Sequence, residues 1–217
     1  YSVGIDIIGR VIEQISGRPL DRYLHEEIFE PLGMVDTGFS VPESAVDRFA
    51  DCFLRTEKNP LVCSERAAGS PYLAGKPDTF SGGGGLVSTL DDYFRFGEMI
   101  RLGGRGNGVQ LLSPRTLSFM RKNHLEGEIA SMGPSSFAEM PMQGTGFGLG
   151  GAVVLEPARA GVPGSAGDFG WGGMASTYFW TDPVEQLTAI FFTQLIPSSS
   201  YPNRAELKAL VHAALVD

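Results

Sequence analysis

The chain has 217 residues, 42% of which are hydrophobic, and its formal net charge is −8. This length allows one large domain with a sizeable core. The lysines and arginines are not gathered into a basic stripe, so we expect no nucleic acid partner. The longest apolar candidate, residues 187–192, is far shorter than the roughly 20 residues of a membrane span and is typical of a core strand, so we predict no membrane span.

Helices are predicted first along the chain. Apolar residues recur at helical spacing from Val3 to Ser16, and a Gly-Arg-Pro stop follows. A second helical pattern begins at Leu20 and is expected to end at Pro31, before a Leu-Gly turn. Residues 40–80 mix proline, glycine, serine and charged residues without a sustained period, so we predict loops, with one helical turn near residues 42–50.

Two capping signals predict the next helices. Ser88 and Asp91 match an S-x-x-D capping box, which opens a helix that runs to the Gly-Gly stop at 103–104. A serine followed by proline at 113–114 starts another helix, because serine caps and proline is favoured at the first helical position. That helix is expected to end near Asn123.

The last third of the sequence changes to aromatic and β-branched runs separated by turn residues. These runs predict three strands, at 147–155, 176–181 and 187–195. The connection 181–186 is short enough for an antiparallel hairpin, and residues 204–216 carry an apolar helical face that suits packing on the sheet. We therefore predict an α+β fold, with a mainly helical region over 1–145 and antiparallel strands with a C-terminal helix over 146–217.

Cysteines and histidines give no sign of a metal site. Cys52 and Cys63 have no histidine nearby, so free thiols are favoured and a disulfide is the alternative. His25, His124 and His212 are far apart in the sequence and lack the spacing of a helical metal site. We expect all three to be surface or structural residues, with neither a zinc centre nor a Ser-His-Asp triad.

Four short segments in a fixed order are the most specific signal in the sequence: Tyr1-Ser2-Val3, Pro31-Leu32-Gly33-Met34, the glycine-rich run 80–89, and Gly170-Trp171-Gly172-Gly173. In order and spacing the chain resembles the C-terminal part of the β-lactamase-like serine hydrolases, a group that includes class C β-lactamases, penicillin-binding carboxypeptidases and family VIII carboxylesterases. The resemblance implies an incomplete serine β-lactamase/transpeptidase-like fold with an antiparallel sheet flanked by helices. It also implies an acyl-serine mechanism without a metal or organic cofactor.

The nucleophile of that family is absent from this sequence. It is the serine of an S-x-x-K motif, and no serine here has a lysine three positions later. By the resemblance, Tyr1 is the general base or proton relay, a role that needs an ammonium group beside the phenol, and the absent lysine would supply it. We expect the nucleophile in a missing N-terminal segment or a second chain, and this chain alone to be inactive.

The Trp171-Gly172-Gly173 segment matches the position of Lys-Thr-Gly in the lactamases. The resemblance places it on a strand lining the cleft, where small residues let substrate lie against the backbone, and makes the amide of Met174 one oxyanion donor. Tryptophan instead of lysine removes the cation that would hold a β-lactam carboxylate, which favours neutral esters. The alternative is that an aromatic residue followed by two glycines is only a tight turn entering a strand.

Three other glycine-rich segments resemble site motifs less specifically. Ser81 and the glycines after it can border the acyl pocket, or form a loop that needs flexible dihedrals before a helix. The run 146–151 matches G-x-G-x-x-G formally but precedes a strand, which argues against a dinucleotide site. The run 163–167 lacks the leading glycine of a G-x-S-x-G elbow and is predicted to be a loop.

The function expected from these patterns is that of the C-terminal portion of an esterase-like serine hydrolase acting on small ester or acyl substrates. A β-lactamase or D-amino-acid carboxypeptidase is the nearest enzyme alternative, because one scaffold hosts all of these chemistries. From a different class, the chain can be a non-catalytic fragment that forms a homodimer or complements another chain by covering an exposed sheet edge. The compartment, cytoplasmic or periplasmic, stays open.

Overall fold

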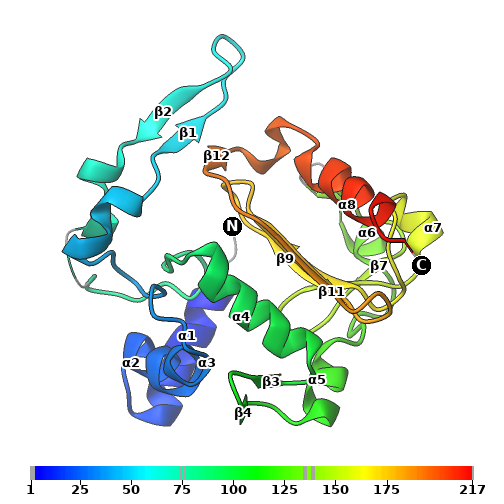
Figure 1. Cartoon of the computed structure of the whole chain (residues 1–217), viewed down its shortest axis with the longest axis horizontal. Helices are drawn as coiled ribbons and strands as arrows, with labels where there is room; N and C mark the ends of the chain where they lie inside the picture. Colours follow the sequence, from blue (N-terminus) through cyan, green and yellow to red (C-terminus); the bar gives the residue numbers. More distant parts are fainter. Residues whose placement is uncertain (1–2, 74, 76, 134–135, 138–139, 217) are drawn as a thin grey trace.

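A five-stranded antiparallel sheet forms the centre of the structure, with a helix on each face. The computed structural model describes residues 3–216 apart from positions 74, 76, 134–135 and 138–139. Helix α4, Leu90–Arg101, packs on one face of the sheet, and the C-terminal helix α8, Asn203–Ala213, lies on the other (Figure 1). The predicted α+β class, with an antiparallel sheet flanked by helices, is confirmed.

The sheet has the order β11-β10-β9-β8-β7. Its strands are β7 Thr145–Phe147, β8 Ala152–Val154, β9 Phe169–Gly172, β10 Tyr178–Asp182 and β11 Leu187–Phe191. The hairpin predicted from the short connection at 181–186 is confirmed, because β10 and β11 pair antiparallel. The single strand predicted over 147–155 is wrong: Gly150, with φ +98°, reverses the chain there, so β7 and β8 pair as a hairpin.

The main apolar core lies between the sheet and α4. Alternate residues of the strands point to this face, as expected for a pleated sheet, and they meet side chains from α4 and from α5, Pro114–Met120. The buried set is Phe29, Leu32, Met34, Met99, Ile100, Leu117, Val153, Phe169 and Phe179. The core therefore fixes the strand face toward α4 and leaves the opposite face of β9 and β10 to α8.

The N-terminal region is a pair of helices as predicted. Helix α1 spans Val3–Ser16, the predicted bounds, and a second helical run follows as α2 Leu20–Leu24, the π-helical turn η1 His25–Phe29, and α3 Glu30–Leu32. Pro31 does not end this run, contrary to the prediction, because the widened π turn before it accommodates a residue without an N–H. The run ends instead at Gly33, which caps it with φ +71°.

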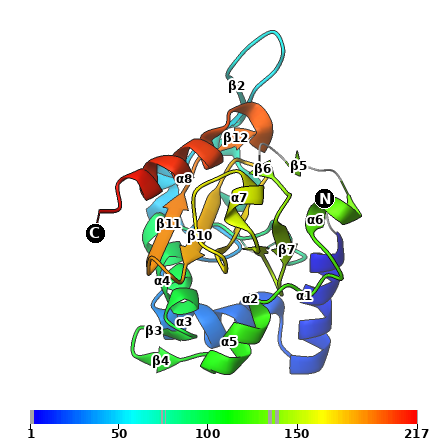
Figure 2. The same cartoon turned by 90° about the vertical axis from the view of Figure 1, so that its right-hand side faces the viewer.

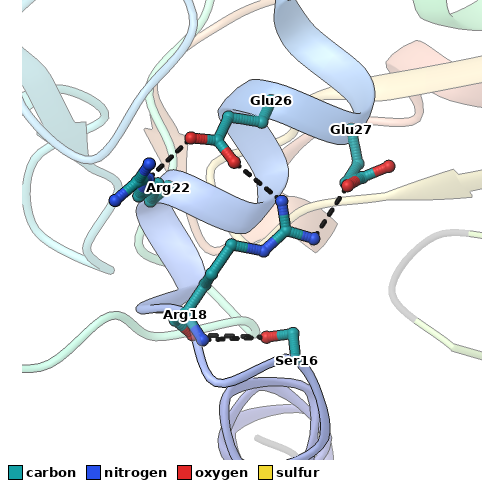
Figure 3. Close-up of polar contacts among 5 residues, drawn as sticks. All are labelled: Ser16, Arg18, Arg22, Glu26 and Glu27. Carbon is teal, nitrogen blue, oxygen red and sulfur yellow. Dashed lines mark hydrogen bonds and ion pairs between the residues drawn. The ribbon is translucent and has the colours of Figure 1, made fainter.

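Arg18 ties the corner between α1 and the second helical run (Figure 3). Its guanidinium donates to Glu26 at 2.7 Å and to Glu27 at 2.7 Å, and its amide donates to the Ser16 hydroxyl at 3.2 Å. Arg22 pairs with the other Glu26 oxygen at 2.6 Å. The planar guanidinium can bind two carboxylates at once, so this cluster links the end of α1 to the second helical run.

The stretch predicted as loops at 40–80 contains a hairpin as well. The predicted helical turn is present as the 3-10 turn η2 Glu43–Arg48, and two more follow, η3 Ala67–Gly69 and η4 Pro71–Leu73. Between them, β1 Cys52–Leu54 and β2 Val62–Glu65 pair antiparallel and project from the rest of the molecule (Figures 1 and 2). The cysteines on these strands are free thiols, as favoured from the sequence.

Strand β12, Leu195–Ile196, comes from near the end of the chain and adds a third strand to this hairpin. The run predicted as one strand over 187–195 leaves the central sheet after Phe191, and its last part pairs in parallel with β1. Phe53 lies opposite Leu195 in this pairing. The projecting hairpin is thus held by a segment that also contacts the turn after β9, described below.

The cap of α4 is one residue from the predicted position. Thr89 is the N-cap, since its hydroxyl accepts the amide of Asp92 at 3.3 Å, whereas the hydroxyl of Ser88 bonds that of Thr37 at 2.8 Å. The predicted Ser88–Asp91 capping box is therefore wrong. Asp92 is buried, and its carboxylate accepts from Thr37 at 2.9 Å, which ties α4 to the loop after α3.

The remaining short elements connect these layers. The Ser113 cap of α5 is confirmed, although the helix ends at Met120, before the predicted Asn123. The others are β3 Arg105–Gly106, β4 Val109–Gln110, α6 Ile129–Met132, β5 Ser136–Phe137, β6 Met140–Pro141, α7 Pro157–Ala160 and η5 Ser198–Ser200. Among the described residues, no helix is both long and apolar enough to span a membrane.

Candidate active site

The Trp171-Gly172-Gly173 segment lies at the end of β9, as the resemblance predicted. The ladder between β8 and β9 covers Phe169 and Gly170, so it ends before this segment, while β10 pairs with it on the other side. The indole of Trp171 packs edge-on against Phe147, with ring centroids 5.1 Å apart. The segment therefore continues beyond the residues of β9 that pair with β8. There its backbone edge can meet the backbone of a ligand.

A tight turn over residues 173–177 follows the segment and carries Met174. The amide of Gly173 donates to the Thr177 carbonyl at 2.9 Å, and the amide of Ser176 donates to the Gly173 carbonyl at 3.2 Å. Leu195 of β12 braces the turn from outside, because its amide donates to Ala175 at 3.1 Å and its carbonyl accepts the Ser176 hydroxyl at 2.7 Å. Met174 is thus held on a turn bonded at both stems.

The Met174 amide is open to a ligand. Within the described part of the chain it donates no hydrogen bond, although the amides of its neighbours Gly173 and Ser176 do. The Met174 side chain is 60% exposed, so the turn lies at the surface. An unpaired N–H on a braced turn has the character of an oxyanion donor, which must be fixed in direction before the reaction begins.

Each of the two glycines has a close neighbour where a Cβ would lie. A Cβ at Gly172 would lie 2.6 Å from the Cζ atom of Arg204, and a Cβ at Gly173 would lie 2.5 Å from the hydroxyl of Thr177. These contacts are a structural reason for glycine at both positions, which the sequence alone did not suggest. The predicted substrate-binding role of Trp171 and the two glycines stays a prediction.

Ser81 lies at the first turn of α1. Its hydroxyl donates to the Asp6 carboxylate at 2.6 Å, and the Gly83 amide donates to the same oxygen at 3.1 Å. The hydrogen bond from Ser81 and that from Gly83 lower the pKa of Asp6. A Cβ at Gly82 would lie 2.8 Å from the Ile5 carbonyl, so the glycine loop packs directly on the helix.

This contact bears on two predicted site residues. Ser81 braces the start of the helix that follows Tyr1, and Tyr1 itself lies outside the described residues. The predicted role of Ser81 at the acyl pocket and of Tyr1 as proton relay both stay predictions. Asp6, which holds the glycine loop, was not singled out from the sequence, because a lone acidic residue in a first helical turn is common.

A buried ionic cluster lies under α8. Asp168 and Lys208 form an ion pair at 2.6 Å, and both side chains are 2% exposed. Burial raises the pKa of Asp168 to about 6, although the Lys208 ammonium opposes this rise. Asp168, Asp182 and His212 offer ligand atoms within 4.8 Å of one another. Because Lys208 already supplies a cation to Asp168, the cluster has a structural explanation as an anchor of α8.

A small cavity separates α8 from the sheet beside this cluster. Its volume is about 60 Å³, and Met142, Val154 and Trp180 line its apolar side. Trp171, Gly172 and Arg204 border it, whereas neither Met174 nor Ser81 lines it. It lies on the α8 face of the sheet, so we place the candidate site at the turn after β9 and not in this cavity.

Arg204 is the principal site neighbour that the sequence did not reveal. It is the second residue of α8, and its side chain is buried under the turn that carries Met174. An arginine at a helix start gives no signal of such a contact, because its partners lie about thirty residues earlier in the chain.

Comparisons with known proteins identify the family of the chain. The beta-lactamase family model matches residues 2–213. Protein Rv1367c of Mycobacterium tuberculosis is 35% identical over 204 residues, covering 92% of this chain and 49% of that protein. Esterase EstB of Burkholderia gladioli is 30% identical over 206 residues, covering 89% of this chain and 48% of that protein. The structure of EstCE1, a hydrolase with promiscuous acyltransferase activity, matches with a TM-score of 0.80 at 27% identity, over 98% of this chain and 55% of that one.

The layered sheet and its relatives define the fold as that of the β-lactamase and transpeptidase class of serine hydrolases. The chain belongs to the beta-lactamase family. It spans about half the length of the relatives it matches.

Proposed function

We propose that this chain is the C-terminal portion of an esterase-like serine hydrolase that acts through an acyl-serine intermediate. The observation that carries the proposal is the open amide of Met174, held on a braced turn directly after Trp171-Gly172-Gly173. The esterase relatives support the reaction class. The nucleophile would come from an S-x-x-K segment that this sequence does not contain, so the chain alone would be inactive.

In this proposal the serine oxygen attacks the ester carbonyl, and its proton passes to the Lys-Tyr pair, of which Tyr1 is a member. The carbonyl becomes an oxyanion that the Met174 amide and the serine's own amide would hold. The alcohol then leaves with the proton. Water next attacks the carbonyl of the acyl-serine and gives a proton to the Lys-Tyr pair. The bond to the serine oxygen breaks, the serine takes that proton back, and the acid is released. No step requires a metal or an organic cofactor.

The substrate proposed is a small neutral ester or acyl group. Trp171 stands where the lactamases have a lysine, and its ring packs against Phe147 in place of a cation beside the turn. An indole does not hold a carboxylate, whereas it offers apolar contact to an acyl or alcohol group. A β-lactamase or D-amino-acid carboxypeptidase activity is therefore the second candidate.

The test is intact mass spectrometry after treatment with a fluorophosphonate, which labels an activated serine. We expect the 217-residue chain alone to stay unlabelled, and the complete protein to gain one label outside these 217 residues. A label on a serine of this chain would overturn the assignment of the nucleophile to another segment. Failure to label the complete protein would overturn the proposed function.

Substrate choice separates the two enzyme candidates. The complete protein should hydrolyse p-nitrophenyl butyrate with a higher kcat/KM than nitrocefin, because the cation for the lactam carboxylate is replaced by tryptophan. The reverse order would favour the β-lactamase candidate. Trp171→Lys in the same protein should shift the ratio toward nitrocefin.

A further proposal concerns partners. Helix α1 lies at the edge of the molecule (Figure 2). It presents an apolar face to solvent, made of Val3, Ile7, Ile8, Val11 and Ile15. Exposed apolar patches of this kind mark interaction surfaces. We propose that the rest of the hydrolase, or a second copy of this chain, covers this face, and that an isolated chain behaves as a fragment that dimerises.

A further inference from the structure

Arg204 is a buried cation that reaches the back of the candidate oxyanion turn. It lies in the first turn of α8, and the residue is 3% exposed. Its guanidinium lies 5.6 Å from the Tyr178 ring centroid, at the start of β10. A buried guanidinium is stable only where its donors are matched by acceptors, so its acceptors indicate what it does.

Two of those acceptors are the carbonyls at the two ends of the turn. The Nη2 group donates to the Gly173 carbonyl at 2.7 Å and to the Thr177 carbonyl at 3.1 Å. The same two residues are joined by the hydrogen bond from the Gly173 amide to the Thr177 carbonyl. One planar NH₂ group thus bridges both carbonyls, which the three diverging hydrogens of an ammonium would do less well.

The bond to Gly173 acts on Met174 through one peptide plane. The carbonyl of Gly173 and the amide of Met174 belong to the same peptide unit, and in a planar trans peptide they point in opposite directions. Arg204 holds the carbonyl on the α8 side, so the Met174 N–H must point to the other side of the turn. A charged donor on the carbonyl also polarises the N–H of that unit.

Glycine at position 172 leaves room for this guanidinium. A Cβ at Gly172 would lie 2.6 Å from Cζ, 2.8 Å from Nη2 and 2.9 Å from Nη1, below any normal contact distance. Gly172 has no left-handed φ that would require glycine for backbone reasons. Its missing side chain is therefore explained by the arginine, which lies flat against the backbone there.

We infer that Arg204 is a positioning residue that aims and polarises the Met174 amide toward the oxyanion. The inference rests on the proposed function, because it assigns a task within that reaction. In this inference Arg204 acts on the oxyanion through the Gly173–Met174 peptide and not by direct contact with the substrate.

The experiment uses the complete hydrolase with Arg204→Lys and Arg204→Gln. Active sites are counted by fluorophosphonate labelling, and kcat and KM for p-nitrophenyl butyrate are expressed per labelled site. We expect kcat to fall about 10- to 100-fold with KM nearly unchanged, less than the roughly 10²- to 10³-fold cost of losing a whole oxyanion donor. The inhibition constant of phenylboronic acid, whose adduct carries an oxygen in the oxyanion position, should rise by a similar factor.

Lys208→Met is the matched control. Lys208 is the buried cation one turn further along α8, and it pairs with Asp168 instead of the turn. It should reduce thermal stability without changing kcat per labelled site or the phenylboronic acid constant. If Arg204→Lys and Arg204→Gln behave like this control, Arg204 serves only to hold α8 and the inference is wrong. A wild-type enzyme that neither takes the label nor hydrolyses the ester would instead overturn the proposed function, and with it this inference.

Discussion

At the scale of single residues, Gly172 and Arg204 compete for one space. The Cβ of an alanine at 172 would lie 2.6 Å from the guanidinium carbon. We expect Gly172→Ala to lower the free energy of unfolding by about 1–3 kcal/mol, the usual cost of overpacking a filled site. The same substitution in an Arg204→Ala background should cost clearly less, because the clashing group is gone. Urea unfolding of the four proteins checks this, and equal costs in both backgrounds would contradict it.

The raised pKa of Asp168 predicts that the free energy of unfolding depends on pH. Burial raises its pKa to about 6 in the folded protein, above the usual aspartate value of 3.8. A carboxyl with a raised pKa binds its proton more tightly when folded, so its stabilising contribution is full below pH 4 and is lost as pH rises through 6. The loss amounts to about 3 kcal/mol, at about 1.4 kcal/mol per pKa unit.

The measurement compares the wild type with Asp168→Asn by urea unfolding between pH 4 and pH 7. The free energy of unfolding of the wild type, relative to that of the variant, should decline across this interval. A difference that stays constant with pH would show that Asp168 titrates near its usual value when folded. Glu185→Gln, an exposed carboxyl in the β10–β11 turn, is the control and should not alter the slope.

At the scale of elements, the cap of α4 gives a direct test. Thr89→Ala removes the hydroxyl that accepts the Asp92 amide, and we expect a loss of about 1 kcal/mol in the free energy of unfolding. Thr89→Ser keeps the acceptor and should change stability by only a few tenths of a kcal/mol. Thermal unfolding of both variants decides the point. Equal effects of alanine and serine would mean that the cap contributes nothing.

The elements that sequence predicted well are those with a long regular pattern. Helix α1 has the predicted bounds because its isoleucines repeat over many turns. The strand over 147–155 was wrong because its apolar run hides a turn at Gly150, and periodicity cannot locate a reversal inside an apolar stretch. The β1–β2 hairpin was missed because its strands are only three and four residues long and contain no buried residue, so they show no core-facing alternation. The division into regions 1–145 and 146–217 stays a prediction.

The candidate site was predictable only where a local motif marks it. Trp171-Gly172-Gly173 lies on a strand end, as the resemblance required, and the turn with Met174 follows. Arg204 and Asp6 were not predictable, because Arg204 reaches the turn, and Asp6 the glycine loop, across a long sequence separation, and neither belongs to a motif. Tertiary contacts of single polar residues leave no periodic trace in one sequence.

At the scale of the whole molecule, the exposed face of α1 predicts association. We expect the isolated 217-residue chain to self-associate at micromolar concentration, because several isoleucines and valines on one helix face are open to solvent. Ile7→Ser combined with Val11→Ser should keep it monomeric in sedimentation velocity. Val184→Ser, an exposed apolar residue in a distant turn, is the matched control and should leave association unchanged. A wild-type chain that sediments as a monomer would contradict the proposal.

The contact between Gly172 and Arg204 also constrains how the two positions can change during evolution. A guanidinium in its present place leaves no room for a side chain at 172, so the two positions constrain each other in evolution despite their distance in the sequence. A lineage that acquires a larger residue at 172 must first lose the arginine, and a lineage that regains the arginine must first restore glycine. Among chains built on this turn, arginine at 204 should therefore occur together with glycine at 172, whereas glycine at 172 can remain where the arginine has been lost.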